Sequence, residues 1–275
     1  MAIAVTFSDD PAAVLGLAGE ALGARPVDAN LVLTLLHARV ATPGPGRYWV
    51  VAAGDDVVGV VFQSPVTFFA TLTPMSRRAV VAAADAIADA GADLPGVIGE
   101  AASAATFAGQ WTERRKAAAE PAMGQRIYEV ELLEPPAGVP GVLRPGGPSD
   151  RDLVVDWVRR FQDDVGEHGA ETAEALVERR LAAGHFRIWD DGGPVSMAAV
   201  TDPVAGVARV GAVYTPDDRR RRGYAAACVA AVSAAVLGGG HRCILYTDLG
   251  NPTSNSVYRR IGYRAVAECL RYRFT

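Results

Sequence analysis

The sequence has 275 residues, of which 50% are hydrophobic and 21% are charged, and its formal net charge is −4. This length suggests two domains, and the apolar content is enough to bury a sizeable core, which excludes global disorder. Because the charge balance is slightly acidic, the chain has no overall basic field, and we expect no nucleic-acid or membrane partner.

The first half of the sequence alternates between helical and strand-like patterns. Apolar residues at helical spacing predict helices, and short runs rich in Val predict strands. The expected helices are residues 12–22, 29–38, 78–90 and 101–115, and the expected strands are 48–53, 57–63, 66–72, 96–99 and 126–133. The Gly-Asp-Asp turn between 48–53 and 57–63 predicts a hairpin.

Residues 134–149 are dense in Pro and Gly. Proline removes a backbone donor and blocks helix formation, so this stretch is more typical of a connection than of a core element. We therefore expect a first domain over residues 1–134, a linker over 135–149 and a second domain over 150–275.

The second half repeats a similar order of elements. Asp150 precedes apolar residues at three- and four-residue spacing, which predicts a capped helix through Phe161. The other expected elements are helices at 171–183, from 223 and at 252–261, and strands at 185–190, 195–200, 207–215, 243–248 and 265–274. Two copies of one α/β unit are the simplest interpretation of both halves.

Four signals concern compartment and metal binding. The three cysteines are too few for a disulfide framework, and the first ten residues lack a cationic region before an apolar one. The longest apolar run, 224–237, is shorter than the ~20 residues of a membrane span. We expect a cytoplasmic protein, and the four histidines show no metal-ligand spacing, so we expect no metal.

The most informative stretch begins where the predicted strand 207–215 ends. It runs into a turn and then a helix that opens on Arg220-x-x-Gly223-x-Ala225. Small residues at a helix start let an anion reach the first backbone N–H groups and the positive end of the helix dipole. Arginines beside them add charge-assisted bonds to phosphate. The pattern predicts a diphosphate cradle; a solvated arginine run before an ordinary helix start is the alternative.

This stretch resembles the acyl-CoA-binding motif of the GNAT superfamily of N-acetyltransferases, in which Arg/Gln-x-x-Gly-x-Gly/Ala follows a strand. A second stretch continues the resemblance, with Asn251, a tyrosine seven positions later at Tyr258, and Ile-Gly-Tyr at 261–263. The resemblance is strong over about 150–275. It implies a mixed α/β fold of tandem GNAT-like domains, each with a mostly antiparallel twisted sheet flanked by helices and splayed between its fourth and fifth strands.

The resemblance also implies where acetyl-CoA binds, as a co-substrate. The backbone of 213–215 would pair with the pantetheine amides, and the N–H groups of 221–226 would hold the diphosphate. The implied cofactor-binding residues are Val213, Tyr214, Thr215, Arg220, Arg221, Arg222, Gly223, Tyr224, Ala225, Ala226, Asn251 and Tyr258.

The implied reaction is direct attack of a primary amine on the thioester carbon in a ternary complex. The departing CoA thiolate needs a proton, which a tyrosine hydroxyl can supply, so Tyr258 is our candidate general acid. The alternative for Tyr258 is a core residue behind the last helix. A strand N–H near Val213 would meet the oxyanion of the tetrahedral intermediate.

The general base is ambiguous. An alkyl ammonium has a pKa near ~10.4, so a group or a water relay must remove a proton before attack. Glu167 is the leading candidate because it lies on the loop between the first two helices of the second half, where a carboxylate could also attract a cationic acceptor. The other candidates are His168, His185, Ser196 and Asp248.

The first half lacks both motifs. After Leu72-Thr-Pro the sequence continues Met-Ser-Arg-Arg without Arg-x-x-Gly-x-Ala, and 99–115 has neither the Asn nor the Tyr. We expect a degenerate GNAT-like domain without a cofactor site. The expected function is an acetyl-CoA-dependent N-acetyltransferase, as monomer or homodimer, acting on a small-molecule or protein amine. A CoA sensor or scaffold without turnover, and a transferase for another acyl-CoA, are the alternatives.

Overall fold

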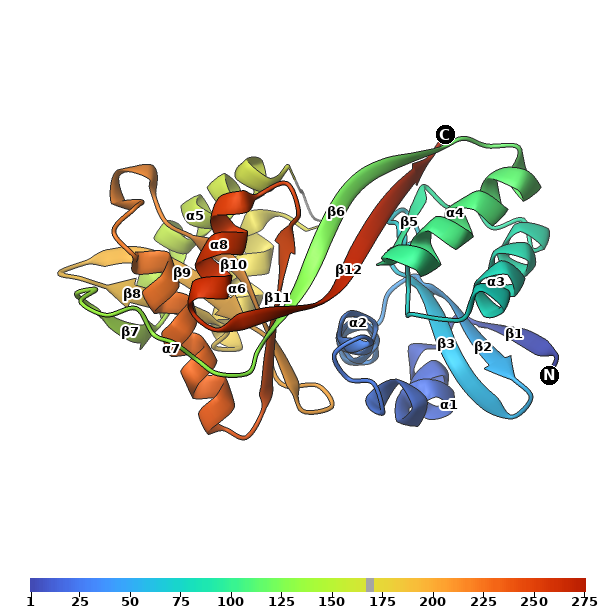
Figure 1. Cartoon of the computed structure of the whole chain (residues 1–275), viewed down its shortest axis with the longest axis horizontal. Helices are drawn as coiled ribbons and strands as arrows, with labels where there is room; N and C mark the ends of the chain where they lie inside the picture. The colour runs from blue at the N-terminus through green and yellow to red at the C-terminus, as the bar shows by residue number, and fades with distance from the viewer. Residues whose placement is uncertain (167–170) are drawn as a thin grey trace. The chain divides into compact units, whose positions relative to one another are not determined.

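The computed structural model of the chain describes residues 1–166 and 171–275. Its contacts divide the chain into two units (Figure 1). Unit 1 comprises 1–127, 248–250 and 267–275, and unit 2 comprises 128–247 and 251–266. Each unit combines a sheet with helices, so the predicted mixed α/β class is confirmed.

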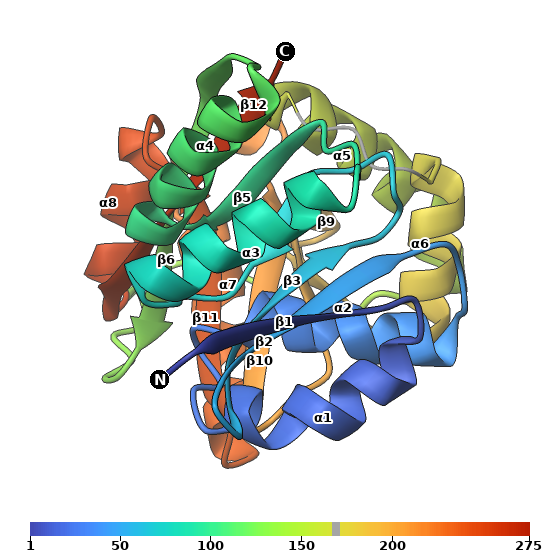
Figure 2. The ribbon, with the colours of Figure 1, turned by 90° about the vertical axis from the view of Figure 1, so that its right-hand side faces the viewer.

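Unit 1 contains the first five strands and the first four helices. The strands are β1 (Ile3–Ser8), β2 (Arg47–Ala53), β3 (Asp56–Gln63), β4 (Ala70–Leu72) and β5 (Gly96–Glu100), and the helices are α1 (Pro11–Gly23), α2 (Asn30–Ala41), α3 (Arg77–Asp89) and α4 (Ala101–Arg115). Helices α3 and α4 lie side by side (Figure 2) and bury the apolar side chains of Trp49 and Val51. Strand β1 has no counterpart among the predicted elements, and β4 is much shorter than the expected strand 66–72.

Unit 2 contains the remaining helices and most of the remaining strands. The strands are the end of β6 (Ala119–Val130), β7 (Val142–Pro145), β8 (Phe186–Asp190), β9 (Pro194–Val200), β10 (Val207–Tyr214) and β11 (Arg242–Asp248), and the helices are α5 (Arg151–Val165), α6 (Ala173–Ala182), α7 (Tyr224–Gly238) and α8 (Pro252–Arg260). The strand order is β6-β11-β10-β9-β8-β7. Strands β7 to β10 pair antiparallel, and β10 and β11 pair parallel.

The sheet of unit 2 is covered on both faces. On one face, Ala198 and Val210 pack in a cluster with α7 and with Tyr258 and Ile261 at the end of α8. On the other face, Met197 packs in a second cluster with α5 and α6. Successive residues of a strand point to opposite faces, which is why the neighbours Met197 and Ala198 belong to different clusters.

The segment expected to be a linker, 135–149, contributes a strand to unit 2. Strand β7 lies within it and pairs with β8 at the edge of the sheet, where a residue such as Pro145 is tolerated because an outer N–H is not needed. Arg144 holds this strand in place: its guanidinium donates to both carboxylate oxygens of Asp150 at 2.8 Å and to Asp190 at 2.9 Å. Asp150 therefore binds Arg144 instead of capping α5 with its side chain.

Strands β6 and β12 also do not follow the expected domain boundaries at residues 134 and 150. Strand β12 (Tyr263–Phe274) comes from the end of the chain, yet Cys269 to Arg273 pair antiparallel with β5 of unit 1. Strand β6 comes from the first half, yet its end at Tyr128–Val130 belongs to unit 2 next to β11. The contact units are therefore not consecutive stretches of sequence.

We predict that Gly262→Ala destabilises the chain by about 2–4 kcal/mol, through a left-handed backbone and an overlap. Gly262 has φ +99°, and an added Cβ would overlap the Leu132 carbonyl oxygen. Gly240→Ala is the matched control, because Gly240 has φ +77° but open space around it, so strain alone should cost about 1 kcal/mol. Urea unfolding curves of both variants and the wild type measure the difference, and equal losses would contradict the overlap.

Candidate functional site

The sheet of unit 2 opens between strands β10 and β11. The parallel register of β10 with β11 runs from Val207 opposite Arg242 to Val210 opposite Leu245 and ends there, although β10 continues to Tyr214 and β11 to Asp248. Two strands that separate in this way leave backbone N–H and C=O groups facing a gap. An extended ligand that carries amides can pair with such groups.

A β-bulge shapes β10 where it leaves β11. Gly211 lies opposite Ala199 and Tyr214 opposite Met197, so two residues of β10 stand against one of β9, and Ala212 has φ +46°. A bulge takes residues out of the regular ladder and redirects their peptide groups. Val213, whose N–H we expect to meet an oxyanion, lies in this bulge.

A buried serine holds the end of β10. The Ser196 hydroxyl donates to the Tyr214 carbonyl at 3.0 Å and lies 2.8 Å from the Thr215 hydroxyl. Ser196 is fully buried and Thr215 nearly so. We therefore assign Ser196, one of the candidate bases, a positioning role, because it fixes the direction in which the strand backbone runs.

Helix α7 starts without a side-chain cap. Gly223 occupies the N-cap position with φ +85°, and Ala227 is the residue whose N–H closes the first helical bond onto the Gly223 carbonyl, at 2.9 Å. The N–H groups before it have no acceptor within the helix. A side chain at 223 would need the left-handed backbone and would lie 2.8 Å from the Val139 Cγ2 atom. Glycine here keeps the helix start open to an anion.

The four consecutive arginines at this helix start have different surroundings. Arg220 donates to the Thr215 carbonyl at 2.9 Å and pairs with Asp164 at 2.8 Å and with Asp217 at 2.9 Å. These bonds connect the strand end, the turn and α5. Arg221 and Arg222 are exposed. Arg220 thus stabilises the turn through its own contacts. Arg221 and Arg222 are better placed to bind a phosphate.

Tyr224, the first residue of α7, is anchored by its side chain. Its hydroxyl donates to the Asp191 carboxylate at 2.6 Å, and this bond raises the pKa of Tyr224. The side chain therefore ties the helix start to the turn between β8 and β9. The backbone N–H of Tyr224 belongs to the first turn of the helix, as the predicted diphosphate site requires.

Asn251 caps α8. A second asparagine, Asn255, was not predicted from the sequence as a site residue. The Asn251 side chain accepts from the Ser254 N–H at 3.0 Å. Asn255 is buried; its amide donates to the Asn251 carbonyl at 2.7 Å, and its oxygen accepts from the Tyr128 hydroxyl at 3.1 Å. Asn255 thus connects α8 to β6. The only sequence signal for it was its position one turn after Asn251.

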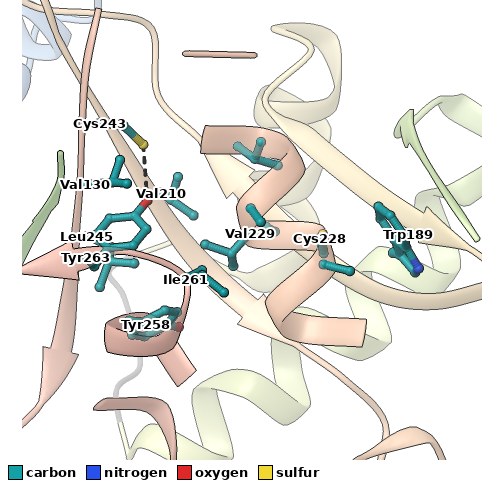
Figure 3. Close-up of a cluster of buried hydrophobic side chains, with 14 of the residues drawn as sticks. Val130, Trp189, Val210, Cys228, Val229, Cys243, Leu245, Tyr258, Ile261 and Tyr263 are labelled. Carbon is teal, nitrogen blue, oxygen red and sulfur yellow. Dashed lines mark hydrogen bonds between the residues drawn. The ribbon is translucent and has the colours of Figure 1, made fainter. Parts of the chain in front are cut away.

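Tyr258 is buried among apolar side chains of unit 2 (Figure 3). Its ring meets Tyr263 edge-on at 6.1 Å, and Ile261 belongs to the same cluster. Burial, with a smaller effect from the Cys228 thiol, raises the pKa of Tyr258 to about 12. The hydroxyl therefore keeps its proton at neutral pH, which is the state a general acid needs.

The candidate general bases are only partly described. Glu167 and His168 lie outside the described residues. His185 forms a pair with Asp202 at 3.1 Å, and Asp248 accepts from the Gly250 N–H at 2.7 Å. The Asp248 contact is local to a turn, whereas the His185–Asp202 pair joins the residue before β8 to a residue after β9.

Residues 1–166 and 171–275 bear on the predictions about metal ligands and membrane-spanning helices. Within these ranges, no three His, Cys, Asp or Glu side chains are grouped as ligands of a metal ion. The helices described there include none that is both long and apolar enough to cross a bilayer.

In unit 1, the strand and helix that correspond to β10 and α7 are β4 and α3, and their ends are paired and capped differently. Strand β4 stays paired with β5 up to its last residue, Leu72 opposite Gly99. Helix α3 is capped by Ser76, whose hydroxyl accepts from the Ala79 N–H at 3.4 Å. Glu100 accepts from Ser103 and caps α4. Side chains of unit 1 thus occupy the groups that unit 2 leaves open at α7.

Comparison with known proteins agrees with this architecture. Residues 193–272, which run from β9 to β12, match a family model described as FR47-like protein. A search of curated proteins finds no match.

Solved structures match over nearly the whole chain. A GNAT-family acetyltransferase from Colwellia psychrerythraea is 10% identical, with 100% of both chains covered and a TM-score of 0.63. A GCN5-related N-acetyltransferase from Sphaerobacter thermophilus is 16% identical, with 98% of this chain and 95% of that chain covered and a TM-score of 0.61. A tandem GNAT protein from the clavulanic acid biosynthesis pathway is 13% identical, with 98% of each chain covered and a TM-score of 0.58.

At these identities the structural matches concern the fold, and the family model covers the part of the sequence that carries both motifs. The tandem arrangement expected from the two similar halves has a solved counterpart of nearly the same extent. The resemblance seen in the sequence is confirmed at the level of the fold: the chain has the fold of GNAT acetyltransferases, and residues 193–272 match the FR47-like family model.

Proposed function

We propose that the chain is an acetyl-CoA-dependent N-acetyltransferase whose active site lies in unit 2. One observation carries this proposal: the opening between β10 and β11 lies directly before an uncapped helix start, at Gly223. The opening offers backbone groups to an extended chain of amides, and the helix start offers N–H groups and a dipole to a diphosphate. Coenzyme A has both parts in this order.

The chain's own residues would act on the two substrates as follows. The N–H groups of 221–226 hold the diphosphate, with Arg221 and Arg222 adding charge. The strand end at 213–215, positioned by Ser196, aligns the acyl arm. The neutral amine nitrogen forms a bond to the thioester carbon and releases an N–H proton to the base, for which Glu167 or a water relay is the candidate, and the carbon–sulfur bond breaks. The Val213 N–H stabilises the oxyanion, and the Tyr258 hydroxyl gives its proton to the leaving sulfur.

Unit 1 is proposed to have no cofactor site. Its helix α3 already uses an N–H of its first turn for Ser76, and β4 remains paired with β5. A ligand would have to break these bonds before it could use the backbone. Two tests examine binding and chemistry separately, so that an acetyltransferase can be told from a CoA sensor or a transferase of another acyl group.

The first test concerns the diphosphate cradle of residues 221–226. We expect one acetyl-CoA per chain and a loss of affinity of at least about tenfold for Ala225→Glu, since a carboxylate about 6 Å from a diphosphate charge costs a few kcal/mol at an effective dielectric constant of about 20. Ala235→Glu, at the exposed far end of α7, is the matched control and should bind like the wild type. Calorimetric titration measures stoichiometry and affinity, and two sites per chain would contradict the assignment.

The second test concerns Tyr258. Replacing it by Phe removes one hydroxyl and keeps the ring, so the packing against Tyr263 and the affinity for acetyl-CoA should persist. If the hydroxyl protonates the leaving thiolate, kcat should fall by about 10²-fold, since general acids contribute about 10²–10⁴-fold. Release of free CoA thiol with a panel of amines and of acyl-CoAs gives kcat. A change within about threefold at saturating amine would assign Tyr258 to packing alone.

A further inference from the structure

The chain between β6 and β7 passes beside the start of α7 (Figure 1). In this stretch the Val139 Cγ2 atom lies 2.8 Å from the position that a Cβ on Gly223 would take, and Val139 packs partly against the cluster beside α7. Val139 is half-buried, and the next residue, Pro140, is exposed. An apolar surface that is open to solvent thus adjoins the N–H groups proposed to hold the diphosphate.

Two contacts fix this stretch to β8. The Trp189 indole N–H donates to the Pro140 carbonyl at 2.9 Å. Gly141 has φ +108°, and an added Cβ would lie 2.6 Å from the Trp189 Nε1 atom and 2.7 Å from the Asp190 carbonyl oxygen. Glycine allows the backbone to approach β8 this closely. Val139 therefore reaches the start of α7 from the β8 side of the sheet.

The start of α7 is tied to β8 by a second route. The Tyr224 hydroxyl donates to the Asp191 carboxylate at 2.6 Å, and Asp191 directly follows the end of β8. Tyr224 thus joins the helix start to β8, as Trp189 joins the residues after Val139 to it. These bonds and the contact of Val139 with the helix start close a ring. The apolar surface at Val139 is therefore held in place before any ligand binds, which lowers the entropic cost of binding.

The strand order indicates which half of coenzyme A lies beside Val139. In unit 2 the strands follow the order β11-β10-β9-β8-β7, and the opening lies between β10 and β11. An acyl arm that starts at the diphosphate must run towards β11 to enter the opening. The diphosphate joins this arm to the adenosine, so the adenosine is directed the other way, towards β8 and Val139. The flat faces of adenine gain from contact with aliphatic side chains that displace water.

We infer that Val139 and Pro140 bind the adenosine of acetyl-CoA and that Trp189 is a positioning residue for them. This inference rests on the proposed function, since it takes the diphosphate to lie at the start of α7. It makes residues 139–141, which the sequence predicted to belong to a linker, a part of the cofactor site. These residues lie before the two sequence motifs and outside the range 193–272 that matches the family model.

The first test compares acetyl-CoA with acetyl-4′-phosphopantetheine, which has the same acyl arm but no adenosine. Val139→Thr keeps the shape of the side chain and replaces a methyl group by a hydroxyl. We expect acetyl-CoA to bind about fivefold more weakly, because the hydroxyl loses its water against the adenine, and acetyl-4′-phosphopantetheine to change by less than about twofold. Calorimetric titration of the full chain measures both affinities.

Val142→Thr is the matched control for this test. It makes the same substitution at an exposed position of β7, three residues further along the chain, and should bind both ligands like the wild type. Equal losses for the two ligands in Val139→Thr would place this side chain at the diphosphate or the acyl arm. That result, or an unchanged affinity for acetyl-CoA, would overturn the inference.

The positioning role of Trp189 is tested with Trp189→Phe, which keeps an aromatic ring and removes the N–H that binds the Pro140 carbonyl. We expect weaker binding of acetyl-CoA and unchanged binding of acetyl-4′-phosphopantetheine. Because both residues act on the same part of the ligand, Val139→Thr should add little in the double variant. Parallel losses for both ligands in a Trp189→Phe chain that circular dichroism shows to be folded, or additive losses, would contradict this role.

The wild-type chain provides a test that needs no variant. The probe is 1,N6-etheno-CoA, whose base is fluorescent, and the quencher is acrylamide. We expect the quenching constant to be at least about twofold lower for the bound probe than for the free one, since a bound base has less surface open to solvent. Equal quenching would overturn the inference.

These binding measurements require no amine, so they separate the inference from the proposed function. If the chain binds acetyl-CoA as expected but releases no thiol with any amine, the transferase activity is refuted and the adenosine site stands. If amines release thiol while Val139→Thr binds both ligands like the wild type, the adenosine site is refuted and the transferase stands.

Discussion

The end of the pairing between β10 and β11 is the constraint on which the candidate site depends. Every buried backbone N–H and C=O needs a partner, so two neighbouring strands separate only where other groups can meet those needs. In unit 2 the Ser196 hydroxyl holds the Tyr214 carbonyl, and a bulge with Ala212 at φ +46° redirects the strand. The remaining groups face the opening, where an amide-rich ligand can serve as the missing strand.

The two units differ in whether a side chain caps the helix that follows the corresponding strand. Helix α7 begins at Gly223 without a side-chain cap, while α3 begins at Ser76 with its hydroxyl bound to a helix N–H. A capping side chain stabilises a helix by using a donor that an anion would otherwise need. The capped start therefore favours the stability of unit 1, whereas α7 in unit 2 begins with no side-chain cap on its first N–H groups.

Charge and proton state at the site follow from side-chain contacts and burial as well as from residue type. Arg219 to Arg222 are adjacent in sequence and all exposed, yet Arg220 is engaged with Asp164, Asp217 and the Thr215 carbonyl, so pairing and not burial distinguishes it. Tyr258 keeps its proton because apolar surroundings disfavour a phenolate.

The sequence by itself determined the local structure: most helices and strands, the hairpins, the need for glycine at 223, and the order of strand, turn and helix that indicates a diphosphate site. These features depend on residues close together in the chain, whose periodicity and backbone preferences can be read directly. Only the tertiary structure decided that β7 lies within the expected linker, that β12 pairs with β5, and that Asn255 reaches Tyr128. Strand pairing uses backbone groups that every residue shares, and side-chain contacts across a sheet join positions far apart in sequence, so local patterns do not specify either one.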